Sequence, residues 1–184
     1  MISQISTHRQ KFSTGSSLIE VLVAALILSF GMLSMIGLQG AATQMNKITQ
    51  FRAEASRLSM DYVDRVKANR TAIANYLIAD SYTGAPAAQT VPTTCQAATE
   101  CSGASLAALD VAEMRERVRT AIPQGAFYVT QQTNAGSTVL DVWVLWQAAT
   151  TKTDGYNTTD GIGCPSGVVS ATGKVQCLLT RFAL

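Results

Sequence analysis

The chain contains a long, nearly uninterrupted run of apolar residues close to its start. Residues 18–38 read LIEVLVAALILSFGMLSMIGL, which is 21 residues with no proline and a single ionisable side chain, Glu20. A helix rises about 1.5 Å per residue, so this stretch would be roughly 32 Å long, close to the roughly 30 Å hydrocarbon core of a bilayer. The pattern therefore predicts a membrane-spanning helix.

Beyond this run, apolar residues return at helical spacing with charged residues between them. The spacings of three, four and seven predict that one helix extends over about residues 17–77, with an apolar face that packs on a sheet. We expect the charged residues to form a solvated helix surface. The apolar positions are Ile48, Phe51, Ala55, Leu58, Tyr62, Val66, Ile73 and Leu77, and the charged ones are Arg52, Glu54, Arg57, Asp61, Asp64, Arg65, Lys67 and Arg70.

The rest of the chain predicts one more helix and three strands, which makes the fold class α+β. Ser105 is the expected cap of the second helix, and the Pro-Gln-Gly sequence at 123–125 ends it. The arginines at 115, 117 and 119 of this helix alternate with acids and apolar residues, which predicts a surface position. In order, we expect a loop over 79–103, a helix over 106–122, strands over 126–132 and 138–147, a polar loop over 150–173 and a strand over 174–183.

Composition and charge exclude several classes of function. Only 14% of the residues are charged, against about 25% in a typical soluble domain, and residues 16–46 contain a single charged residue, Glu20. A net charge of +2 is too small for a nucleic-acid binder. With one histidine, His8, and no visible catalytic group of titratable residues, the sequence predicts neither an enzyme nor a cofactor or metal site.

The basic residues ahead of the apolar run predict its orientation. Residues 1–15 contain Arg9 and Lys11 and no acid, which holds that end in the cytoplasm and places the rest outside. Three interpretations compete: a plain anchor, a signal peptide cut near residues 40–42, and a leader cut before the apolar segment. The run is longer than the roughly 7–15 apolar residues of a signal peptide. A charged side chain inside a membrane helix costs about 2.5–3.5 kcal/mol, so Glu20 is the informative residue.

Residues 15–23, GSSLIEVLV, resemble the cleavage and assembly motif of type IV pilins. In that family a basic leader ends in glycine, a membrane peptidase cuts after it and methylates the new amino group, and a glutamate is the fifth mature residue. Gly15 and Ser16 match the cleavage site, Ser16 is the expected methylated residue, and Glu20 is fifth from Ser16. The extended run resembles PilV-type minor pilins, and GspI-type pseudopilins are similar. Ser16 departs from the phenylalanine that most pilins have there.

The resemblance implies a type IV pilin-like fold, in which a long N-terminal helix, half transmembrane and half amphipathic, packs on a small antiparallel sheet. The implied segments are a leader at 1–15, a transmembrane and assembly helix at 16–42, and a periplasmic head at 43–184. The implied function is a minor pilin that primes pilus assembly and lies at or near the fibre tip. A pseudopilin of type II secretion and a pilus-borne adhesive module are the alternatives.

The implied partners are the prepilin peptidase, other minor pilins, the major pilin and the inner-membrane assembly platform. The expected location is the inner membrane, crossed once, and then the pilus. Cleavage after Gly15 creates an α-amino group that is mostly protonated at neutral pH. The amino terminus of a neighbouring subunit can therefore pair with Glu20 and offset the desolvation of both charges, so we assign Glu20 to subunit docking.

Four cysteines outside the membrane, in an oxidising compartment, predict two disulfides in one of three pairings. The local pairing, Cys95–Cys101 with Cys164–Cys177, closes two short loops, and the second pair resembles a disulfide that closes the C-terminal loop in many type IV pilins. Neither pair has the close spacing of a zinc site. Acidic residues over 154–161 could donate oxygens to calcium, but their spacing does not match an EF-hand, and a solvated turn is the expectation.

Overall fold

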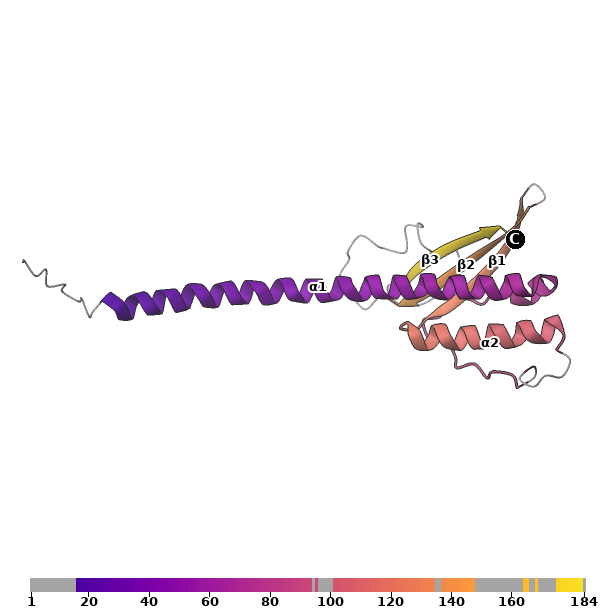
Figure 1. Ribbon diagram of the computed structural model, residues 1–184, viewed down its shortest axis with the longest axis horizontal. Coiled ribbons are helices and arrows are strands. Elements are labelled where there is room, and N and C mark those ends of the chain that lie inside the picture. Colours follow the sequence, from indigo (N-terminus) through magenta and orange to yellow (C-terminus); the bar gives the residue numbers. More distant parts are fainter. Residues whose placement is uncertain are drawn as a thin grey trace, which may run out of the picture. The chain divides into compact units, whose positions relative to one another are not determined.

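The computed structural model describes residues 16–93, 95, 101–134, 137–147, 164–165, 168 and 175–183, so the expected leader and the 154–161 loop lie outside the described residues. The chain divides into two compact units, Met1–Met45 and Asn46–Leu184. We call the second the sheet unit. One long N-terminal apolar helix and a small three-stranded antiparallel sheet confirm the predicted α+β layout (Figure 1). The elements are α1 (Ser16–Ala68), η1 (Arg70–Tyr76), α2 (Gly103–Ala121), β1 (Ala126–Asn134), β2 (Ser137–Gln147) and β3 (Val175–Ala183).

Helix α1 ends at Ala68, so the prediction of one helix as far as Leu77 is wrong in its last part. At Asn69 the backbone leaves the helical region, and the chain continues as the 3-10 helix η1. The Asn69 amide Nδ2 donates to the Gly103 carbonyl at 2.7 Å and to the Tyr76 hydroxyl at 3.2 Å. Gly103 lies 34 positions further along the chain, so the periodicity of α1 alone could not have revealed the break.

The C-terminal part of α1 supplies one side of the main core. Leu58, Tyr62 and Val66 are completely buried, as their spacing predicts. The Tyr62 ring stacks on Phe127 of β1, with ring centroids 5.1 Å apart. The remaining buried members of this cluster include Ala55, Val63, Tyr76, Ile78, Met114, Val118, Val129, Leu140, Val142, Val144 and Trp146.

The sheet has the order β1-β2-β3, with antiparallel neighbours throughout. Val142 of β2 pairs with Val129 and Thr180, and its face of the sheet contributes to the main core. Leu145 points to the opposite face, where it joins a second, smaller cluster with Tyr82, Val168 and Val175. Apolar cover on both faces explains the poor alternation of apolar and polar residues along β2.

Helix α2 begins earlier than predicted, and its cap is Ser102 in place of Ser105. The Ser102 hydroxyl oxygen accepts the backbone N–H of Ser105 at 3.1 Å, which satisfies one of the free amides of the first turn. After α2, Gly125 lies so close to the helix that an added Cβ would come within 2.2 Å of the Val118 carbonyl oxygen. Only glycine fits this approach between the end of α2 and the start of β1.

All four cysteines are paired, and the pairing is the local one. Cys95 bonds Cys101 with Cα atoms 5.3 Å apart, and Cys164 bonds Cys177 with Cα atoms 5.0 Å apart. Cys177 is opposite Leu145 in the β2–β3 ladder, so the second disulfide packs against the smaller hydrophobic cluster.

Candidate functional site

The predicted assembly residues map to the start of α1. Ser16 and Glu20 lie within this helix, and Gly15 is outside the described residues. No hydrogen bond or ion pair joins Glu20 to any other residue in the part of the chain that the structure describes, and its side chain is exposed. Among the residues that the structure describes, this carboxylate therefore has no partner.

Glu20 also has no basic residue near it along α1. The next basic residue in the sequence is Lys47, which is 27 positions further on. At about 1.5 Å per residue, the two lie about 40 Å apart along the helix. A cation that pairs with Glu20 must therefore come from outside this part of the helix.

The N-terminal part of α1 is apolar all the way round. Every described side chain from 18 to 47 is exposed, and large residues such as Leu18 (73%), Phe30 (65%) and Leu38 (72%) present most of their surface. Among the described residues, one helix is long and apolar enough to cross a membrane, and it contains this segment. A helix that is apolar on every side needs an apolar environment, either a lipid bilayer or other helices.

The few hydroxyl groups in this segment are satisfied by the helix itself. Ser29 Oγ donates to the Ala25 carbonyl at 2.7 Å, and Ser34 Oγ donates to the Phe30 carbonyl at 3.0 Å. Thr43 Oγ1 donates to the Gly40 carbonyl at 2.8 Å. Internal hydrogen bonds of this kind remove the penalty that unpaired hydroxyls would carry in lipid. Within residues 18–38, Glu20 is then the polar side chain that has no partner among the described residues.

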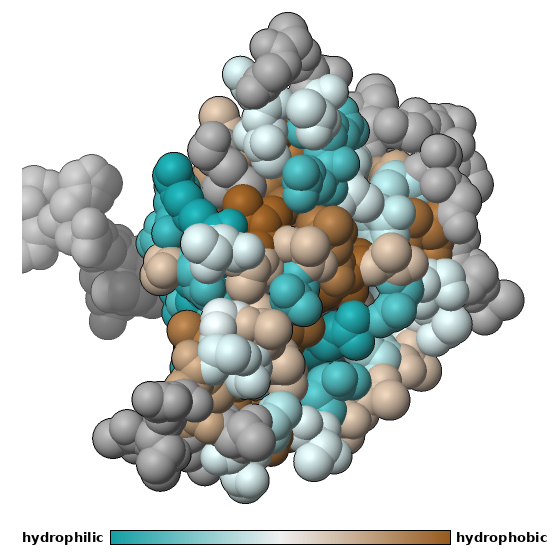
Figure 2. All heavy atoms as spheres, turned by 90° about the vertical axis from the view of Figure 1, so that its right-hand side faces the viewer, coloured by the Kyte–Doolittle hydropathy of each residue, from teal (hydrophilic) through white to brown (hydrophobic). Residues whose placement is uncertain are grey.

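The sheet unit has a different surface. Its large exposed apolar side chains are scattered, as with Met60 on α1, Leu106 on α2 and Leu179 on β3. Figure 2 shows one end of this unit, where hydrophilic residues surround a smaller area of hydrophobic ones. The continuous apolar surface is therefore a property of the N-terminal part of α1.

A partly buried charged cluster joins α1 to α2 inside the sheet unit. Arg65 Nη1 donates to Asp110 Oδ1 at 2.5 Å and to Glu113 Oε2 at 3.0 Å, and the Tyr76 hydroxyl donates to Asp110 Oδ2 at 2.7 Å. Burial, and then the bond to Asp110, raises the pKa of Tyr76 to about 12. The prediction that Arg65 lies on a solvated surface is wrong, because α2 packs over it.

A second polar cluster lies on the face of the sheet that carries Leu145. Asp141 is only 2% exposed, and Arg181 donates to both of its oxygens, at 2.6 and 2.9 Å. Gln132 Nε2 donates to the same carboxylate at 3.1 Å. Every strand contributes one residue, so this cluster ties the three strands together and has the character of a structural contact.

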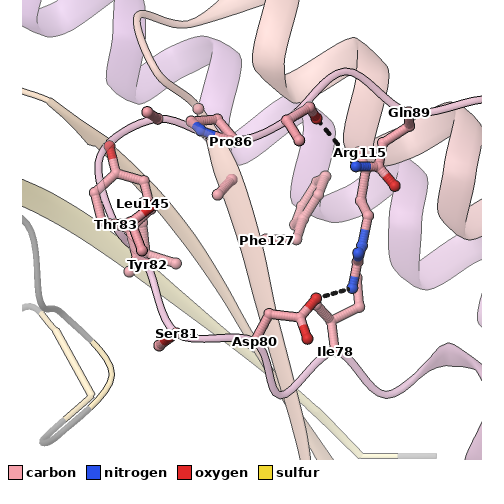
Figure 3. Close-up of a pocket in the computed structure, with 14 residues that line it drawn as sticks. Ile78, Asp80, Ser81, Tyr82, Thr83, Pro86, Gln89, Arg115, Phe127 and Leu145 are labelled. Carbon is pink, nitrogen blue, oxygen red and sulfur yellow. Dashed lines mark hydrogen bonds and ion pairs between the residues drawn. The ribbon is translucent and has the colours of Figure 1, made fainter.

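The sheet unit also contains a cavity of about 380 Å³ that the sequence did not suggest. It lies between the segment after Ile78, the side chain of Arg115 on α2, and the start of β1 (Figure 3). Arg115 is mostly buried, with 28% of its side chain exposed, so the prediction of a simple surface position for it is wrong. No pattern in the sequence pointed to it, because residues 79–103 have the Ala-, Thr-, Ser-, Gly- and Pro-rich composition of a connecting loop.

Comparisons with known proteins found no relative of this chain. No family model, no curated protein and no solved structure matches the chain. Within the described residues, no group of three or more histidine, cysteine or acidic side chains is placed to hold a metal ion.

Proposed function

We propose that the chain is a minor subunit of a type IV pilus, similar to the PilV-type minor pilins. The observation that supports this most strongly is a lone carboxylate, Glu20, at the head of an otherwise apolar helix segment, with no partner among the described residues. The sequence GSSLIEVLV at 15–23 supplies the second support, because it combines a cleavable glycine with a glutamate at the fifth position after it.

A plain membrane anchor explains the apolar surface but leaves the carboxylate without a purpose. Glu20 would cost about 2.5–3.5 kcal/mol within the membrane, and an anchor would be better without it. An α-amino group created at Ser16 of a neighbouring subunit is a cation at the right depth of the bilayer. Pairing the two offsets the desolvation of both charges, and a misplaced subunit would bury an uncompensated charge. The pair would therefore set the axial register between subunits.

The proposed mechanism is assembly by insertion of helices. The prepilin peptidase removes residues 1–15 and methylates Ser16, and the segment 16–42 waits in the inner membrane with the head on the periplasmic side. On assembly, Glu20 pairs with another subunit, and the apolar side chains exchange lipid for the helices of other minor pilins or of the major pilin. Burial of this surface stabilises the fibre, because an apolar patch of this size does not remain in water.

N-terminal sequencing of the mature protein, with mass detection of methylation, tests the proposal. We expect the mature chain to begin at Ser16 with a methylated amino group. Gly15→Val should leave the leader attached, whereas the matched variant Ser13→Val, two residues upstream, should be processed normally. A mature chain that begins near Thr43 would show an ordinary signal peptide and would refute the proposal.

The pilus itself needs a separate test, since type II secretion pseudopilins have a similar N-terminal motif. Deletion of the gene should abolish or reduce twitching motility and leave protein secretion intact. Loss of secretion with normal twitching would instead assign the chain to the shorter fibre of a secretion system.

A further inference from the structure

The cavity of the sheet unit opens where a strand pairing stops. Ile78 and Val129 exchange two backbone hydrogen bonds, at 3.1 and 2.8 Å, as an antiparallel pair. Two residues further, the same register would place Asp80 opposite Phe127. No hydrogen bond joins Asp80 to Phe127 in the described part of the chain, because the segment leaves β1 after Ile78. The cavity of about 380 Å³ fills this gap.

The floor of the cavity offers an unpaired strand edge and apolar side chains. In an antiparallel strand, alternate residues direct both backbone polar groups to the same side. Val129 directs both its N–H and its C=O to Ile78, so Phe127 directs its own N–H and C=O to the same edge of β1. Neither of these Phe127 groups has a hydrogen-bond partner among the described residues. Ile78, Tyr82 and Leu145 supply the buried apolar lining around them.

The rim of the cavity is polar and forms a nearly closed ring. Figure 3 shows that the segment from Ile78 to Gln89 curves around the cavity and that Arg115 crosses the remaining side, between Asp80 and Gln89. The Gln89 backbone N–H donates to Glu116 at 3.2 Å, which fastens the far end of the segment to α2. Hydrogen bonds from Arg119, and then from Gln89, lower the pKa of Glu116 to about 2.

Arg115 is the cationic group on this rim, and its contact with Asp80 is replaceable. Its Nη2 donates to Asp80 Oδ2 at 2.5 Å, while the Asp80 side chain is 72% exposed. Its Nε is buried and has no partner among the described residues. A guanidinium has five donors in a fork that matches a carboxylate, so Arg115 has donors to spare for a ligand with a negative charge.

We propose that this cavity binds the carboxyl-terminal end of another, extended protein chain. The terminal carboxylate pairs with Arg115 in competition with Asp80, the main chain continues the β1 edge through Phe127, and an apolar last side chain occupies the floor. Main-chain pairing to a strand edge and capture of a terminal carboxylate are both established modes of peptide recognition. The nearly closed ring favours a chain end over a strand that passes through. The proposal does not depend on assembly through Glu20.

Peptide binding to the full-length chain in detergent micelles tests the proposal. The probes are a fluorescein-labelled peptide, Gly-Ala-Val-Leu, with a free carboxylate, and the same peptide as a C-terminal amide, followed by fluorescence anisotropy. We expect the amide to bind at least about tenfold more weakly, because it lacks the charged partner of Arg115. The amide also controls for partition of the apolar peptide into detergent.

Two variants with opposite expected effects separate a binding role from a structural one. Arg115→Gln should lose the preference for the free carboxylate, whereas Asp80→Asn should tighten binding of the free acid, since it removes the competing carboxylate. Arg117→Gln, on the same helix but outside the cavity lining, is the matched control and should bind like the wild type.

The position of the peptide has its own measurement. Binding of the peptide with a free carboxylate should slow hydrogen exchange at the backbone amide of Phe127. This measurement uses the wild-type chain, so it does not depend on the folding of any variant. Equal affinity for acid and amide, unchanged affinity in Asp80→Asn, or unchanged exchange at Phe127 would each overturn the proposal. Equal binding of a peptide whose only carboxylate is an internal aspartate would show that the site takes acidic side chains and would refute the requirement for a chain end.

Discussion

Two carboxylates show how differently the chain treats its charged residues. Asp110 is 8% exposed and accepts hydrogen bonds from Arg65 and Tyr76, so its charge is compensated inside the sheet unit. Glu20 is exposed on an apolar helix segment, and no residue in the described part of the chain contacts its carboxylate with a donor. A charge that is satisfied within the fold stabilises the fold, whereas a charge left unsatisfied there is available for another molecule.

Substitution of Glu20 tests that availability. Glu20→Ala should insert into the membrane as well as the wild type, because it removes a charge from the apolar segment. The proposed assembly mechanism also predicts that its incorporation into fibres falls about tenfold or more, because the ammonium group of a neighbouring subunit would lose its partner. Immunoblots of membrane and sheared-fibre fractions measure the two quantities. Gln39→Ala, near the other end of the same segment, is the control and should assemble normally. Normal incorporation of Glu20→Ala would remove the docking role.

At the scale of elements, the contact between α1 and α2 organises the sheet unit. Asn69 ends α1 and donates to the Gly103 carbonyl at the start of α2, and Arg65 reaches Asp110 and Glu113 from the turn before. Three bonds thus converge where the chain changes direction. The long helix is therefore interrupted by contacts with a helix that follows it by more than 30 positions in the sequence.

Removal of the central carboxylate of this contact should be costly. We expect Asp110→Ala to lower the free energy of unfolding by about 1–3 kcal/mol, because the Tyr76 hydroxyl loses its acceptor and Arg65 loses one of its two carboxylates on α2 in a mostly buried place. Asp64→Ala removes an exposed carboxylate next to Arg65 on α1, and it should change the free energy of unfolding by about 0.5 kcal/mol or less. Urea unfolding of both variants, followed by circular dichroism, measures the difference, and equal stability would show that the cluster contributes nothing.

At the scale of the whole molecule, the two disulfides differ in what they hold. Cys95–Cys101 closes a short loop ahead of α2, with a sequence separation of 6. Cys164–Cys177 has a separation of 13 and joins a residue outside the sheet to β3, next to the cluster of Tyr82, Leu145 and Val175. The second bond therefore supports the face of the sheet that α1 does not cover.

Loss of the Cys164–Cys177 disulfide should lower the free energy of unfolding more than loss of the Cys95–Cys101 disulfide. By the chain-entropy model, replacement of Cys164 and Cys177 by serine should cost about 3 kcal/mol, against about 2.4 kcal/mol for Cys95 and Cys101. Trp143 packs against the smaller cluster, as Cys164 and Cys177 do. Replacement of Cys164 and Cys177 should therefore change the tryptophan fluorescence of the folded protein, whereas replacement of Cys95 and Cys101 should not. Thermal unfolding and emission spectra test both expectations, and an unchanged spectrum in the Cys164 and Cys177 variant would contradict the assigned packing.

The sequence by itself determined the features that depend on neighbouring residues. The run at 18–38 predicts an apolar helix because nearly all of its residues are apolar whatever they later contact. The spacing of Leu58, Tyr62 and Val66 predicts the buried face of α1 because a helix has a fixed period. The apolar and branched residues over 138–147 predict a strand, because they suit a pleated, buried backbone. Glu20 stands out in the sequence itself, since it is the only charge in its surroundings.

Only the tertiary structure decided which distant residues meet. Arg65 and Arg115 look alike in the sequence, yet one pairs with Asp110 under α2 and the other with Asp80 on the rim of a cavity. The end of α1 at Asn69, the cap at Ser102 and the gap after the Ile78–Val129 pair likewise depend on contacts between separate segments. Local patterns report backbone period and solvent preference, whereas the partner of a polar side chain depends on how the elements pack in space.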